Sequence, residues 1–146
     1  MIVATAHGQV LRIPLKPFRT PSTKAGRKFC RLRPGDKVVF VELLRDATTM
    51  FLASSHARVL HFAINEVPIL SGPGKGVRGM KLAVDDKVLG AALMTHARDC
   101  LRAITTHDKE LVFGQTKYET SSRGGKGFKT VQRSGFARIL REPIQL

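Results

Sequence analysis

The chain alternates short apolar stretches with turn residues, and few of its apolar positions recur at helical spacing. Apolar or alternating runs bounded by Gly, Pro, Asp or Asn are typical of strands. Eight segments of this kind predict strands, at residues 10–14, 37–44, 50–55, 58–63, 87–95, 100–105, 110–114 and 136–140. The one stretch with some helical character, residues 90–101, is interpreted as two strands around a turn at Ala97–Asp99. The pattern therefore predicts an all-β protein.

The strand pattern repeats along the chain. The segments "TAHGQVLRI" (residues 5–13), "SSHARVLHF" (54–62) and "TTHDKELVF" (105–113) align without gaps, which places their histidines 49 and 51 residues apart. A period near 50 residues with about four short strands per unit is typical of propeller-like arrays, in which neighbouring units bury each other's sheets. We expect a single β-pinwheel or propeller-like region over residues 1–146, a partial pinwheel of about three four-stranded blades. The expected repeats are approximately 1–53, 54–104 and 105–146.

The composition limits the partners of such an array. The 146 residues carry 25 Lys and Arg against 11 Asp and Glu, a formal net charge of +14. An excess of this size opposes compaction, and its usual explanation is a polyanionic partner, with nucleic acid ahead of an anionic membrane. No apolar run is long enough to span a bilayer, and the N-terminal residues lack the pattern of a signal peptide. Two cysteines do not make a disulfide framework, so we expect unpaired, buried thiols and a reducing cytoplasm.

The positive charge is concentrated in glycine-containing loops, one about 20 residues after the histidine of each repeat. Glycine allows φ > 0 and close backbone approach, so that N–H groups can face a phosphate, while Lys and Arg add charge. No base-reading motif accompanies the loops, so the expected contacts are with phosphates. The candidate DNA-binding residues are Lys24, Arg27, Lys28, Lys75, Gly76, Arg78, Arg123, Gly124, Gly125, Lys126, Gly127 and Lys129.

The histidines invite a metal or catalytic interpretation. Three of them are equivalent positions at expected hairpin turns, one per repeat and too far apart to share one ion: His7, His56 and His107. His61 lies within an expected strand and His96 ends another, so neither is interpreted as a metal ligand. The pair Asp85–Asp86 fits a turn and has no third carboxylate nearby. We therefore expect no metal site in this chain.

The third basic loop carries the most specific motif. The repeat unit resembles the blade of the C-terminal β-pinwheel domain of the A subunit of bacterial type IIA topoisomerases, DNA gyrase and topoisomerase IV. That family's box is Gln-Arg-Arg-Gly-Gly-Lys-Gly, and Ser121–Gly127 matches its last five positions. Weaker echoes lie at Gly72–Gly76 and Lys24–Arg27. The first two box positions are Ser here, and the best copy lies in the last repeat, whereas gyrase carries its box in the first blade. In this respect the chain resembles topoisomerase IV more, although the sequence does not decide between the two.

The resemblance implies non-sequence-specific binding and wrapping or bending of duplex DNA, in support of ATP-dependent change of DNA topology. The partners that it implies are the topoisomerase catalytic core and the B subunit, with ATP and Mg²⁺ held there and no cofactor in this chain. It also implies a bacterial cytoplasmic, nucleoid-associated protein. Family pinwheels have more than three blades, and the third repeat here lacks a "GDKVV"-like strand. We expect either a piece of a larger subunit or a short homologue that needs a partner.

No catalytic residue is expected in this chain. Topoisomerases cleave DNA through a tyrosine, but Tyr118 stands at the repeat position of Phe18 and Val67, which predicts a packing role. The basic loops are not P-loops, because Lys75 is followed by Gly76 instead of Ser or Thr. The chain would then be a non-catalytic part of an ATP-hydrolysing isomerase.

Three alternatives to DNA binding stay open. An RNA- or ribosome-binding β-protein would share the charge but needs exposed aromatics, and most of the nine aromatic residues lie within strand patterns. An enzyme using the histidines would need an acid or a nucleophile beside one of them. A propeller-type protein-interaction scaffold would prefer an acidic partner. The DNA hypothesis requires that Arg27, Lys75 and Lys126 lie on one continuous, exposed surface.

Overall fold

The computed structural model describes residues 1–141, and these form an all-β chain with eleven strands and two 3₁₀ helices. The strands are β1 Ile2–Thr5, β2 Gln9–Arg12, β3 Val38–Glu42, β4 Thr49–Ser54, β5 Arg58–Ala63, β6 Val77–Arg78, β7 Val88–Met94, β8 Cys100–Thr105, β9 Glu110–Gly114, β10 Phe128–Lys129 and β11 Phe136–Leu140. The 3₁₀ helices are η1 Lys16–Phe18 and η2 Ile64–Glu66. Within the described residues, no helix has the length and apolar character needed to cross a membrane.

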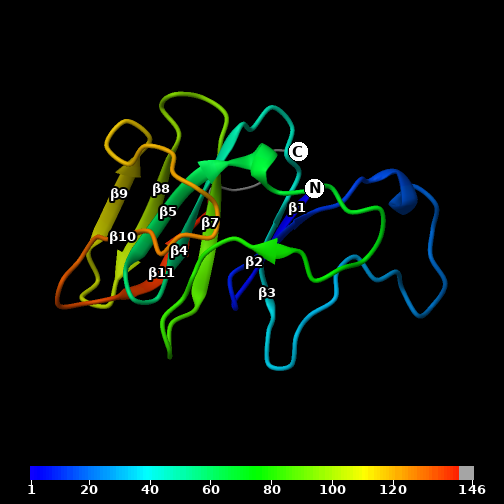
Figure 1. Cartoon of the computed structure of the whole chain (residues 1–146), viewed down its shortest axis with the longest axis horizontal. Coiled ribbons are helices and arrows are strands. Elements are labelled where there is room, and N and C mark those ends of the chain that lie inside the picture. Colours follow the sequence, from blue (N-terminus) through cyan, green and yellow to red (C-terminus); the bar gives the residue numbers. More distant parts are fainter. Residues whose placement is uncertain (142–146) are drawn as a thin grey trace.

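The strands form three antiparallel sheets, here called blades 1 to 3; Figure 1 shows blade 1 to the right of blades 2 and 3, which overlap in that view. Blade 1 has the order β3-β1-β2-β6, blade 2 the order β7-β4-β5-β10, and blade 3 the order β11-β8-β9. The short fourth strands of blades 1 and 2 come from much later in the chain than the hairpins that they join. The predicted all-β, propeller-like fold is confirmed. Blade 3 has three strands within the described residues, because none of those residues pairs with the outer edge of β9.

Local sequence accounts for most of these strands. The predicted turn at Ala97–Asp99 lies between β7 and β8, so the stretch with helical character is indeed two strands. Three strands escaped prediction. Every residue of β1 is buried, so this strand lacks the alternation of apolar and polar residues that is typical of a strand with one face exposed to solvent. The two-residue strands β6 and β10 lie in glycine-containing loops and are defined by the neighbouring strand, not by their own pattern.

The core lies between the blades. One cluster, which includes Phe40 and Phe62, joins blade 1 to blade 2. A second, which includes Phe113 and Phe136, joins blade 2 to blade 3. Tyr118 packs against the second cluster with its ring edge-to-face to Phe113 at 5.3 Å between centroids, as its repeat position predicted. Because each sheet face is buried only by its neighbour, the blades stabilise one another.

The two cysteines are free, as expected, but they are half-buried where the sequence predicted buried thiols. Burial raises the pKa of the Cys30 thiol, with the Asp36 carboxylate adding to the effect. Cys30 lies in a basic loop and packs against the small cluster around Val3 and Leu11.

The equivalent histidines lie at hairpin turns, as predicted. In blade 1, Asp36 Oδ1 accepts a hydrogen bond from the His7 backbone N–H at 2.9 Å. In blade 2, Asp86 Oδ1 accepts one from the His56 N–H at 3.0 Å. Both imidazole Nδ1 atoms lie 3.9 Å from the other carboxylate oxygen. These contacts join each hairpin to the start of the long strand of its own blade, so the two histidines belong to turn structures.

His61 lies in β5 and is buried, with its ring stacked on Phe51 at 4.1 Å between centroids. Its Nδ1 lies 2.7 Å from the Tyr118 carbonyl oxygen and its Nε2 lies 2.7 Å from Thr49 Oγ1. A carbonyl oxygen can only accept, so Nδ1–H donates to it and Nε2 accepts from the hydroxyl. Burial lowers the pKa of His61, and the hydrogen bond to Tyr118 opposes this effect without cancelling it.

Acidification should therefore lower the free energy of unfolding. Because the pKa of His61 is lower in the folded chain than its unfolded value of about 6.5, the unfolded chain binds more protons as the pH falls below that value. We expect a lower midpoint of thermal unfolding at pH 5 than at pH 7.5. His61→Gln should reduce this difference, whereas His96→Gln, at an exposed turn, should keep it. An undiminished difference in His61→Gln would assign the pH dependence to other groups.

Candidate nucleic-acid interface

Three basic loops carry the residues that the sequence singled out: loop 1 (24–33), loop 2 (70–81) and loop 3 (121–130). Loop 2 crosses blade 1 and supplies β6, which pairs with β2. Loop 3 crosses blade 2 and supplies β10, which pairs with β5. Loop 1 contains no strand. The loops are held by the blades, so their cations are carried on an ordered surface.

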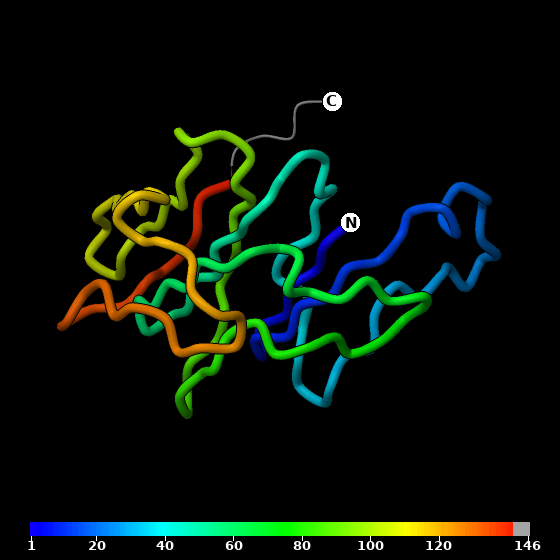
Figure 2. Tube along the Cα trace, turned by 45° about the horizontal axis from the view of Figure 1, so that its top comes forward, coloured from blue at the N-terminus to red at the C-terminus, as the bar shows by residue number. Residues whose placement is uncertain are grey.

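The three loops contact one another in the order loop 1, loop 2, loop 3. The Arg31 N–H donates to the Gly74 carbonyl at 2.9 Å, which joins loop 1 to loop 2. The Lys81 N–H donates to the Gly125 carbonyl at 2.9 Å, which joins loop 2 to loop 3. These hydrogen bonds occupy equivalent repeat positions, and Figure 2 shows the blue, green and orange loops in that order. The basic loops thus form one continuous surface, here called the basic track, as the DNA hypothesis requires.

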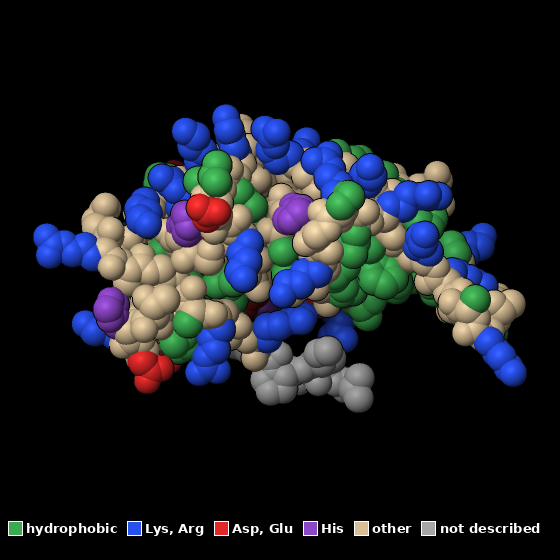
Figure 3. All heavy atoms as spheres, turned by 90° about the horizontal axis from the view of Figure 1, so that it is seen from below, with side chains coloured by type: hydrophobic (Ala, Val, Ile, Leu, Met, Phe, Trp, Pro, Cys, Tyr) green, Lys and Arg blue, Asp and Glu red, His purple; other side chains and the backbone are tan. Residues whose placement is uncertain are grey.

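Most of the predicted cations are exposed on this track. They are Lys24, Arg27, Lys28, Lys75, Arg78, Lys126 and Lys129. Within residues 1–141 none of them forms a salt bridge with a carboxylate. Figure 3 shows Lys and Arg side chains spread over one face and along its upper edge, with few acidic side chains among them. The positive charge of the track is therefore available to an external anion.

Arg123 differs from the other predicted cations, because it is half-buried and its side chain binds the protein backbone. Its Nε donates to the Glu66 carbonyl at 2.7 Å and its Nη1 donates to the Arg78 carbonyl at 2.6 Å. These contacts attach loop 3 to η2 and to β6. Lys129 also makes a backbone contact, with its Nζ 2.7 Å from the His56 carbonyl. Lys126 is the loop 3 cation that points to solvent without such a contact.

The glycines of the loops serve the contacts between each loop and the blade that it joins. Gly76 and Gly127 have φ of +76° and +74°, and a Cβ on either would lie 2.2 or 2.4 Å from the carbonyl oxygen of Val10 or Val59, respectively. The close backbone approach inferred from the sequence is thus made to a neighbouring strand. Gly124 also has positive φ, and the Gly125 carbonyl accepts from loop 2. Both therefore shape the track from within.

Two further cations of the track were missed by sequence reasoning. Arg31 and Lys81 are both exposed, and they stand at equivalent positions 50 residues apart in the repeat. The Arg31 Nε also lies 3.3 Å from the Pro73 carbonyl oxygen. Extending the alignment of the basic loops by a few residues would have identified them, because a cation recurs at that position.

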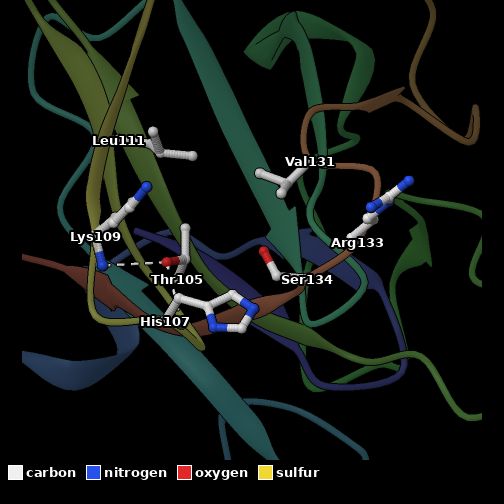
Figure 4. Close-up of a pocket in the computed structure, with 7 residues that line it drawn as sticks. All are labelled: Thr105, His107, Lys109, Leu111, Val131, Arg133 and Ser134. Carbon is white, nitrogen blue, oxygen red and sulfur yellow. Dashed lines mark hydrogen bonds between the residues drawn. The ribbon is translucent and has the colours of Figure 1, made fainter.

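A pocket of about 250 Å³ opens on blade 3 (Figure 4). Its lining residues are Thr105, His107, Lys109, Leu111, Val131, Arg133 and Ser134. The Lys109 N–H donates to Thr105 Oγ1 at 3.1 Å, which stabilises the turn at its rim. The lining contains no carboxylate or thiol, so His107 has no acid partner for general acid–base chemistry there. Its apolar wall, formed by Leu111 and Val131, suits a packing surface.

A family model matches most of the chain. The model described as "DNA gyrase C-terminal domain, beta-propeller" matches residues 1–45 and 48–93, together more than half of the sequence. The DNA gyrase A subunit of Salmonella typhimurium is 29% identical over 138 residues, which cover 92% of this chain and 16% of that protein. The DNA gyrase A subunit of Pseudomonas aeruginosa is 29% identical over 131 residues, which cover 87% of this chain and 14% of that protein. The chain thus spans less than one fifth of the length of these relatives.

Solved structures share the fold. The C-terminal domain of DNA topoisomerase IV superposes with a TM-score of 0.83 at 21% identity, over 95% of this chain and 45% of that one. The DNA gyrase A C-terminal domain superposes with a TM-score of 0.77 at 20% identity, over 95% of this chain and 46% of that one. Each solved domain is therefore about twice as long as this chain.

Proposed function

We propose that this chain, which belongs to the DNA gyrase C-terminal β-propeller domain family, binds duplex DNA along its basic track and bends it. The observation that carries the proposal is the contiguity of the three loops, whose exposed cations have no carboxylate partners within the described residues. Duplex DNA presents about one charge per 1.7 Å of axis, so a protein that follows it needs cations at intervals along a continuous surface. The track supplies this arrangement, and its contacts are with phosphates.

The proposed role of this binding is to present a DNA segment to the catalytic core of a type IIA topoisomerase in the bacterial cytoplasm, at the nucleoid. Strand passage and ATP hydrolysis, with its Mg²⁺, would take place in that core and in the B subunit. This chain supplies the charged surface and no cofactor. The relatives that contain such a segment are named as A subunits of DNA gyrase, which supports this assignment.

The proposal is tested by removing one exposed cation from each loop. In the triple variant Lys28→Ala, Lys75→Ala and Lys126→Ala, we expect weaker binding of long duplex DNA in fluorescence anisotropy. The slope of log K against log salt should fall in magnitude by about three, because three phosphate contacts are lost. Circular dichroism should show an unchanged fold, since these side chains are exposed.

A matched control carries the same loss of charge at exposed positions outside the three loops, namely Arg45→Ala, Arg98→Ala and Arg138→Ala. It should retain most of the affinity and of the salt slope. Equal losses of affinity in the two triple variants would contradict binding along the track, because net charge alone would then account for the affinity.

A single-stranded partner is the second candidate, because Phe128 lies in the track and is 54% exposed. Exposed aromatic rings beside cations suit stacking of unpaired bases. Competition between duplex DNA and single-stranded RNA distinguishes the two. The DNA proposal expects duplex to displace the RNA and Phe128→Ala to leave duplex affinity unchanged. Stronger binding of the RNA, lost in Phe128→Ala, would favour the second candidate.

A further inference from the structure

Blades 1 and 2 each gain their fourth strand from a loop in the same way, and each such pairing is here called a seam. In the first seam, Val77 of β6 lies opposite Val10 of β2. In the second, Phe128 of β10 lies opposite Val59 of β5. In each seam the residue before the added strand is a left-handed Gly that packs on the carbonyl opposite. An apolar pair and a glycine contact thus define a seam.

Each seam also has two backbone hydrogen bonds at equivalent positions. At one end, Leu70 N–H donates to the Arg12 carbonyl in the first seam, and Ser121 N–H donates to the His61 carbonyl in the second, both at 2.8 Å. At the other end, the loop donates to the carbonyl of the hairpin turn, Gly8 in the first seam and Ala57 in the second. A seam is therefore a repeated unit with two halves. The loop half is the loop that supplies the added strand, and the strand half is the strand with which it pairs.

One loop half and one strand half remain without partners among the described residues. Loop 1 has Gly26 with φ of +77°, but nothing lies within 4 Å of the position of its Cβ. Arg27 and Lys28, which follow it, are exposed and form no strand. The outer edge of β9 pairs with no described strand. These halves lie toward opposite ends of the long axis, where Figure 1 shows β9 at the left and the blue loop at the right.

The two free halves match each other in charge. The repeat register places Arg27 where the formed seams have Val77 and Phe128, and it places Glu110 where they have Val10 and Val59. Where the two formed seams pair apolar residues, the two free halves thus carry residues of opposite charge. Oppositely charged residues directly opposite in an antiparallel pair stabilise it. Within residues 1–141 neither Arg27 nor Glu110 forms a salt bridge, and both are exposed.

The pocket on blade 3 is the unfilled part of the same unit. Its apolar residues Leu111 and Val131 correspond, 51 positions later, to Leu60 and Met80 of the second seam. Loop 3 covers that pair, since a Cβ on Gly125 would lie 3.8 Å from Leu60 and the Met80 Cε lies 3.2 Å from the same position on Gly127. Among residues 1–141 no loop covers Leu111 and Val131, so within this part of the chain the pocket of about 250 Å³ in Figure 4 is open.

We propose that two copies of this chain associate head to tail, with loop 1 of each copy adding a strand to β9 of the other. Arg27 then lies opposite Glu110, Gly26 packs on the Glu110 carbonyl, and loop 1 covers the pocket. Two such seams close the pair, which contains about as many residues as one solved domain, since this chain covers 45 and 46% of those domains. Closure also continues the basic track from loop 3 of one copy to loop 1 of the next.

The test uses charge reversal at the seam and measures mass by sedimentation over a range of concentrations, on protein freed of nucleic acid. The unaltered chain should shift from 16.1 kDa toward twice that mass as its concentration rises. Arg27→Glu places two acids in each seam, and Glu110→Arg places two cations there, so each variant alone should stay monomeric. An equimolar mixture of the two variants should associate, because both seams then join opposite charges. One seam pairs the unaltered Arg27 of the Glu110→Arg chain with the unaltered Glu110 of the Arg27→Glu chain, and the other pairs the two substituted positions.

The control variants Lys24→Glu and Glu119→Arg make the same charge changes outside the predicted pair, and each should associate like the unaltered chain. A chain that remains at 16.1 kDa at every concentration overturns the proposal. Association that survives both single reversals, or a mixture that stays monomeric, overturns it as well. Each result is independent of DNA binding, so it leaves the proposed function to its own test.

Discussion

Raising the salt concentration from 50 to 200 mM is expected to weaken duplex binding about 10³-fold. Each cation that contacts a phosphate releases counterions, so log K falls linearly with log salt, at a slope of about −5 for some six contacts. The basic track has the exposed cations that this number of contacts requires, in a chain with net charge +14. Affinity should be measured by anisotropy at several salt concentrations on one long duplex.

The slope distinguishes the track from other modes of binding. A protein that recognised base edges or an apolar partner would show a shallow dependence, because few counterions would be released. A flat titration between these salt concentrations would contradict binding along the track. Circular dichroism at both salt concentrations serves as the control, since it shows whether the fold itself responds to salt.

The sequence predicted the fold through its repeats more than through its strands. The gapless alignment of three hairpins fixed the period, and the period indicated blades that bury each other's faces. The strand pattern failed at β1, which is buried on both faces, and at β6 and β10, which exist because a neighbouring strand offers them hydrogen bonds. A short strand that is added to a sheet edge from a distant part of the chain leaves no hydrophobic periodicity in the sequence that would reveal the pairing.

The candidate site was predicted by position but only partly by role. Exposed cations such as Lys75 and Lys126 lie where the repeat placed them. Arg123 belongs to the most specific motif, yet two of its donors bind backbone carbonyls. Composition shows how many donors a loop has, whereas the acceptor that each donor faces is set by tertiary packing. This is also why the glycines suggested a phosphate cradle, while Gly127 packs on the Val59 carbonyl.

Gly127→Ala is expected to lower the free energy of unfolding by about 3 kcal/mol, the second large effect. A left-handed conformation costs an alanine about 1–2 kcal/mol, and forcing a methyl group into a packed site costs about 1–3 kcal/mol. The methyl group would meet the Val59 carbonyl oxygen at 2.4 Å and the Val59 carbonyl carbon at 2.8 Å, and such backbone atoms of a paired strand have little room to relax. For a chain of this size the loss corresponds to a fall of about 10 °C in the midpoint of thermal unfolding.

The matched control is Gly26→Ala, which separates the two parts of that loss. Gly26 has the same left-handed conformation, with φ of +77° against +74°, but its Cβ position is open. Gly26→Ala should therefore lose only the conformational part, about 1 kcal/mol. Both glycine substitutions should be made in the Arg27→Glu chain. That chain is expected to be monomeric, so Gly26 is not buried by a second copy. Equal losses at the two glycines would mean that conformation alone accounts for them, and that loop 3 does not depend on its close approach to β5.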